Sequence, residues 1–179
     1  MCLNPETMCG GPTGSRLALA RMPQPGEWTQ DRLAAALSGP HPSLLRRMRA
    51  GVALLGNAEE PPGSCVLVID DPSVRRLTDL PREHRVRFLE DVDLLGEAVH
   101  NVCRRHAPGF GWVDLEIRGG GDLLAASVRP RYLLEGGARD THDDLRAELL
   151  AELDVIDAAG RADYPAQHVY GSRPTRRSV

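Results

Sequence analysis

The stretch Leu124-Ala125-Ala126-Ser127-Val128-Arg129-Pro130-Arg131-Tyr132 decides the fold of this chain. It has the length of a strand and ends close to a proline, a residue that central strands exclude. Strand side chains alternate between two faces, so every second residue should lie on the same face. On one face we expect Leu123, Ala125, Ser127, Arg129 and Arg131.

The segment before this stretch predicts a partner strand. From Trp112 to Arg118, apolar and charged residues alternate strictly. Gly119-Gly120-Gly121-Asp122 then forms a hairpin-like connection into the next strand. One side of the partner strand carries Val113, Leu115 and Ile117, and the other carries Asp114, Glu116 and Arg118. By parity, the charged side should lie beside Arg129.

The rest of the chain predicts two more strands and three helices. Apolar residues at alternating four- and three-residue steps identify one long helix, with Thr78 or Asp79 as its N-cap and Pro81 in its first turn. A shorter helix follows an N-cap at Thr29. The expected helices are the short one from Gln30 to Leu37, the long one that ends at about His106, and one from Thr141 to about Ala158. The two further strands are expected from Met48 to Leu55 and from Ser64 to Ile69. The predicted organisation is an N-terminal arm (residues 1–43), one α+β domain (44–160) and a C-terminal tail (161–179).

The composition argues against several classes of function. The net charge is −3, so no field of one sign favours nucleic acid as a partner, and all 22 basic residues are arginine, which excludes lysine chemistry. The longest apolar run, Cys65 to Ile69, is far shorter than the roughly 20 residues that span a bilayer. Without the pattern of a signal peptide, we expect a cytoplasmic protein with free thiols. The spacing of Cys2 and Cys9 does not suit zinc, and neither a metal nor a cofactor is expected.

The order of these motifs resembles the histidine triad (HIT) superfamily. In that family a His-x-His-x-His run leads into a hydrophobic pair and often Pro-Arg-Tyr, and Val128 to Tyr132 is similar to this ending. The segment from Val113 to Gly120 is similar to the strand before the triad, and the segment from Asn57 to Asp70 to an acidic turn and the strand that follows it. The resemblance covers residues 44–136 and looks closest to the bacterial branch like diadenosine-polyphosphate hydrolases. It implies an antiparallel sheet of about five strands, a purine nucleotide site and a homodimer.

Placed on this pattern, each functional residue of the family is replaced. The histidine positions hold Leu123, Ala125 and Ser127, so the residue that attacks the α-phosphate in relatives is an alanine here. The ribose-binding acid falls on Asn57, which still hydrogen-bonds a hydroxyl. The phosphate-contacting asparagine falls on Gly120, which offers only a backbone N–H. Alanine supplies neither a nucleophile nor a proton, so the family's hydrolysis is not expected.

The remaining polar residues of this face are the candidate site. Arginine forks match carboxylate or phosphate groups, and carboxylates act as general acids or bases if burial raises their pKa. The candidate catalytic residues are Asp114, Glu116, Ser127 and Arg129. The candidate ligand-binding residues are Asn57, Arg118, Gly120, Ala125, Ser127 and Arg129. The same alternation is equally typical of a solvated sheet face with salt bridges across it.

Three functions remain open from the sequence. The first is a degenerate HIT-like protein that binds a nucleotide or another small anionic metabolite without histidine-dependent hydrolysis. The second is an enzyme of a bacterial biosynthetic pathway that uses the carboxylates and arginines for new chemistry. The third is a pseudoenzyme that acts through its surfaces as a scaffold or regulatory subunit. Fold alone does not decide among them.

Overall fold

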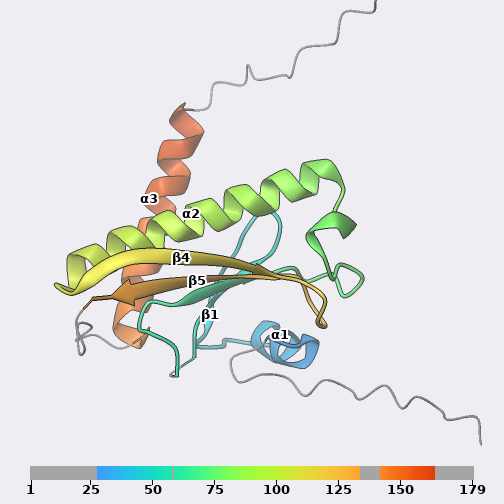
Figure 1. Cartoon of the computed structure of the whole chain (residues 1–179), viewed down its shortest axis with the longest axis horizontal. Helices are drawn as coiled ribbons and strands as arrows, with labels where there is room; N and C mark the ends of the chain where they lie inside the picture. The colour runs from blue at the N-terminus through green and yellow to red at the C-terminus, as the bar shows by residue number, and fades with distance from the viewer. Residues whose placement is uncertain (1–27, 58, 134–141, 164–179) are drawn as a thin grey trace, which may run out of the picture.

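The computed structural model describes residues 28–57, 59–133 and 142–163. Within them, five strands form one antiparallel sheet in the order β1-β2-β3-β5-β4, with helices on both faces (Figure 1). The elements are α1 (Gln30–Leu37), β1 (Leu44–Arg47), β2 (Val52–Leu55), β3 (Cys65–Val68), a 3₁₀ turn (Leu77–Asp79), α2 (Arg82–His106), β4 (Phe110–Arg118), β5 (Ala125–Tyr132) and α3 (His142–Asp163). The predicted α+β class and the five-stranded antiparallel sheet are therefore confirmed.

One face of the sheet forms the main core beneath α2. Phe88 and Leu95 of α2 are fully buried against the sheet, where Ala126 and Val128 of β5 are fully buried in turn. The four- and three-residue apolar steps of the sequence correspond to this buried side of α2. Helix α3 packs against α2 and closes the same cluster with Leu145, Leu149 and Leu153.

Burial also explains the two cysteines among the described residues. Cys65 on β3 and Cys103 on α2 are free thiols inside the main core. Removal from water raises the pKa of both thiols, so each stays protonated and unreactive. The expectation of free thiols is confirmed for these two cysteines.

The opposite face of the sheet is covered in part by α1 (Figure 1). Leu33 and Ala36 of this helix are buried against the sheet in a second apolar cluster. Thr29 caps the helix by accepting a hydrogen bond from the Arg32 N–H, as predicted. The sheet contributes Val52, Leu54, Val66 and Val68 to this cluster, and the segment just before β5 contributes Leu123.

The predicted strand from Met48 to Leu55 is wrong in its first half, because β2 begins only at Val52. The chain turns over residues 48–51 and separates β1 from β2, with the Met48 N–H donating to the Gly51 carbonyl at 2.8 Å. Asp91 of α2 accepts the Ala50 N–H at 2.7 Å and so holds the turn from a distant part of the chain. A partner this remote leaves no local signal in the sequence.

The predicted start of the long helix is also wrong. Asp79 does not cap α2, because its carboxylate accepts the backbone N–H groups of Arg75 and Arg76 and stabilises the 3₁₀ turn instead. Pro81 occupies the N-cap position, and its fixed φ directs the chain into the helix. The predicted end at His106 is confirmed, whereas α3 continues to Asp163, beyond the predicted end near Ala158.

Candidate functional site

The β4–β5 hairpin brings the predicted site residues onto one face of the sheet. Its register pairs Asp114 with Arg129, Glu116 with Ser127, and Arg118 with Ala125. Directly opposed residues of an antiparallel pair point to the same side. The predicted shared face of the two strands is therefore confirmed.

Salt bridges run across this hairpin. Arg131 Nε lies 2.6 Å from Asp114 Oδ2, and the Glu116 Oε2 atom lies 2.7 Å from Arg118 Nη2 and 3.3 Å from Arg129 Nη1. We call these five residues the charge ladder. Two of these contacts, Asp114–Arg131 and Glu116–Arg129, join diagonal partners on neighbouring strands, and the third joins residues two apart on β4.

The ladder lowers the pKa of its two carboxyl groups. Hydrogen bonds from Arg131 and then from Trp112 hold the pKa of Asp114 below its ordinary value, and a hydrogen bond from Arg118 does the same for Glu116. Both groups are ionised at neutral pH, so neither meets the condition set above for a general acid. Their chemistry is that of hydrogen-bond acceptors.

Glu60 joins the ladder, although the sequence did not single it out. It lies in the loop between β2 and β3, and its Oε1 atom is 3.5 Å from Arg129 Nε. Its other oxygen accepts the Asn57 N–H at 3.2 Å. The only available signal was its place three residues after Asn57, because the contact with Arg129 spans 69 positions.

Asn57 completes this connected group. Its side-chain oxygen Oδ1 is buried and has no hydrogen-bond partner in the described structure. Buried acceptors are usually paired, so this oxygen is an exception among the buried polar atoms of the described residues. Through Glu60, Asn57 is linked to Arg129.

The three positions that the resemblance assigns to the triad lie where this face changes from apolar to charged. Leu123 is buried against α1, and Ala125 packs beside it at the edge of the same apolar cluster. Ser127, the third position, is partly exposed and faces Glu116 of the ladder. The face is therefore apolar on the side of α1 and charged on the side of β4.

Gly120 is placed differently from the expectation. It lies in the β4–β5 connection with φ near +91°, a conformation that suits glycine. Its backbone N–H donates to the Arg75 carbonyl at 2.8 Å. This bond uses the one group that Gly120 had to offer a phosphate.

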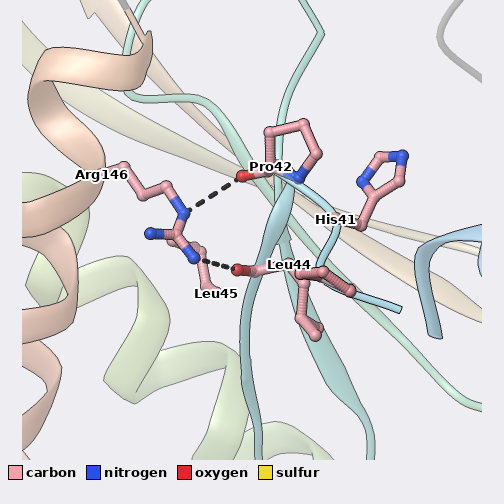
Figure 2. Close-up of a pocket in the computed structure, with 6 residues that line it drawn as sticks. His41, Pro42, Leu44, Leu45 and Arg146 are labelled. Atoms are coloured by element: carbon pink, nitrogen blue, oxygen red, sulfur yellow. Dashed lines mark hydrogen bonds between the residues drawn. The ribbon is translucent and has the colours of Figure 1, made fainter. Parts of the chain in front are cut away.

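Two cavities lie away from the ladder. The larger, of about 470 Å³, lies between α3 and the segment from Pro40 to Leu45. Figure 2 shows Arg146 reaching across it to donate to the carbonyls of Pro42 and Leu44, at 3.1 and 2.9 Å. The smaller, of about 210 Å³, is lined by Arg46, Arg47, Met48, Arg49, Asp91, Leu94 and Asp157. Neither cavity includes a predicted site residue.

Comparison with known proteins identifies the fold. A zinc-bound histidine triad family protein from Mycobacterium smegmatis superposes with a TM-score of 0.50 and 18% identity, over 71% of this chain and 95% of the other. The chain has the histidine triad fold. A histidine triad protein from Marinobacter aquaeolei VT8 is also similar, with a TM-score of 0.49 and 20% identity over 63% of this chain and 88% of that one. No family model and no curated protein matches the sequence.

Among residues 28–57, 59–133 and 142–163, no three His, Cys, Asp or Glu side chains gather as a metal site would require. In the same part of the chain, no helix combines the length and apolarity needed to cross a membrane.

Proposed function

We propose that this HIT-fold chain binds a nucleotide or another small anionic metabolite and does not cleave it by the histidine-dependent route. The observation that carries the proposal is the guanidinium of Arg129, only 21% exposed, on the face of β5 where the resemblance places the triad. An anionic group fits against this guanidinium.

The alanine at position 125 argues against hydrolysis. A methyl group attacks no phosphorus and carries no proton. Ser127 is the neighbouring hydroxyl, but its β4 neighbour is Glu116, a carboxylate already engaged by Arg118 and Arg129. Three of the described histidines are engaged elsewhere: His41 contacts Ser43, His100 contacts Phe110 and His106 contacts Glu148.

Asn57 supports a ligand that carries a hydroxyl or an amine. Its unpaired Oδ1 accepts a hydrogen bond, and the family resemblance puts the ribose contact at this position. Glu60 contacts both Asn57 and Arg129 and so holds them in one connected group. An anionic ligand with a donor group engages Asn57 with the donor and Arg129 with the anion.

Thermal unfolding in the presence of a ligand panel tests this function. The panel contains AMP, cyclic AMP, GMP, ribose 5-phosphate, inorganic phosphate and a dicarboxylate. A ligand at 100 times its Kd adds about 2.7 kcal/mol to the free energy of unfolding. We expect at least one compound to stabilise the protein, Arg129→Ala to abolish the effect, and diadenosine polyphosphate to stay uncleaved.

Arg47→Ala is the matched control. Arg47 is an exposed arginine that pairs with Asp70 at 2.8 Å, outside the ladder. The Arg47→Ala substitution removes the same charge as Arg129→Ala but lies outside the proposed site, so the ligand should still stabilise this variant. If no compound in the panel stabilises the wild type, or if both arginine variants lose the effect equally, the proposed site is wrong.

A second candidate function, the surface-based one, rests on an apolar region along α2 and edge strand β4. Leu115 on β4 is 51% exposed and lies over Gly96 of α2, where an added Cβ would come within 3.3 Å of its Cδ2 atom. Ile117 on β4 and Leu89 on α2 are also exposed beside it. Exposed apolar side chains next to an unpaired strand edge favour association, so we propose a homodimer through this region.

Light scattering after gel filtration tests the dimer. Leu115→Glu places a charge in the centre of the proposed interface and should raise the dissociation constant at least about tenfold. Val155→Glu, at a similarly exposed site on α3, should leave the mass unchanged. A wild type that is monomeric at high concentration would exclude this assembly.

A further inference from the structure

Arg129 lies between two carboxylates that come from different parts of the chain. Glu60 faces one side of the guanidinium, with Oε1 3.5 Å from both Nε and Nη2. Glu116 faces the Nη1 atom at 3.3 Å. The two acids therefore occupy different sides of a single cation.

The two carboxylates are held in different ways. Glu60 is only 19% exposed and is tied to its own loop by the Asn57 N–H. Its Oε2 atom also lies against Gly56, where an added Cβ would approach within 2.7 Å. Glu60 therefore cannot leave Arg129 without disturbing the loop that carries it.

Glu116 is free to leave Arg129. Its side chain is 53% exposed on an edge strand, and the oxygen that faces Arg129 makes a shorter contact, 2.7 Å, with Arg118. Releasing Arg129 costs Glu116 its weaker partner and preserves the stronger one. The Nη1 atom is thus the accessible side of the guanidinium.

We propose that Glu116 is an internal anion that the ligand displaces from Arg129, and that Glu60 is the positioning residue that holds the guanidinium in place. This inference rests on the proposed function and adds a specificity to it. After displacement, Glu116 stays close through Arg118 and repels the bound anion. The ladder with Glu60 holds three guanidiniums and three carboxylates, so it offers no net positive charge to a dianion. The site therefore favours a singly charged ligand group over a phosphomonoester dianion.

Calorimetric titration at pH 8 with AMP, a dianion, and cyclic AMP, a monoanion, tests the two roles. Glu116→Gln should bind AMP about thirtyfold more tightly, the factor for removing a unit like charge roughly 4 Å from a dianion in water. Its effect on cyclic AMP should be smaller. The control Glu90→Gln removes an equally exposed carboxylate that pairs with Arg49 on another part of the surface, and should change neither affinity.

Glu60 variants separate positioning from simple charge repulsion. Glu60→Ala removes a negative charge but also frees the guanidinium, so AMP affinity should stay within about twofold of the wild type or fall. Glu60→Gln keeps an acceptor for the Asn57 N–H and should restore at least wild-type affinity. Melting curves establish that each variant is folded.

The outcomes distinguish this inference from the function beneath it. If Arg129→Ala abolishes binding but Glu116→Gln leaves AMP affinity unchanged, the displacement idea fails and the proposed function stands. If Glu60→Ala and Glu116→Gln tighten AMP equally, Glu60 does not position Arg129. If neither the wild type nor Glu116→Gln binds either probe, both proposals fall.

Discussion

Strand β5 presents two faces that differ in what determines their residues. Toward α2, Ala126 and Val128 are fully buried and contact the main core. On the opposite face, Ser127 and Arg129 are partly open to solvent, beside acidic side chains from β4 and the β2–β3 loop. Close packing restricts the first face to apolar side chains of suitable volume. The second face tolerates many residue types, so its arginine bears on function more than on folding.

The core face should give the largest change in stability. Phe88 of α2 is fully buried beneath the sheet, so Phe88→Ala removes a large apolar side chain and leaves a cavity. We expect the free energy of unfolding to fall by about 3–5 kcal/mol, measured by urea denaturation. A loss below about 1 kcal/mol would mean that α2 does not pack on the sheet as described.

Adjacent residues of β5 sharpen the contrast. Val128→Ala on the core face should lower the free energy of unfolding by roughly 2 kcal/mol, since it deletes buried methyl groups. Ser127→Ala on the opposite face should change it by no more than about 0.5 kcal/mol. Urea denaturation of the two variants side by side measures both effects. Equal losses would show that the two faces are packed alike.

The sequence predicted the elements whose signals are local. The alternation from Trp112 to Arg118 has the two-residue period of a strand, and it correctly placed Asp114 and Glu116 beside Arg129. The apolar steps of α2 likewise identified its buried side and its end at His106. In each case neighbouring residues alone carry the periodic pattern.

Contacts between distant parts of the chain could not be predicted. The β1–β2 turn depends on Asp91, and the position of Glu60 depends on Arg129, 69 residues away. Neither pair leaves a periodic trace. The packing of α1 on the sheet was missed for the same reason, because its apolar residues match any exposed apolar surface. The candidate site was thus predicted as β4 and β5 residues together with Asn57 and Gly120, but without Glu60, which links Asn57 to Arg129.

Buried and exposed carboxylates should respond to pH with opposite signs. Asp91 is 3% exposed, and desolvation raises its pKa in the folded protein, so from about pH 3.9 upward the folded state binds more protons than the unfolded state. Its contribution to stability is therefore lost as pH rises through this window. Asp114 has a lowered pKa because of Arg131 and Trp112, so its contribution is present above about pH 3.9 and is lost as pH falls through the folded value.

Urea denaturation of wild type, Asp91→Asn and Asp114→Asn between pH 3 and 7 compares the two groups. The wild type should lose stability relative to Asp91→Asn as pH rises, and gain stability relative to Asp114→Asn over the acidic part of the range. The second effect should be the smallest of those predicted, because water and salt screen the exposed ladder. The wild type is compared with each variant by its difference in the free energy of unfolding. If both differences change in the same direction with pH, Asp91 and Asp114 do not have opposite pKa shifts, and the contrast between buried and exposed carboxylates is wrong.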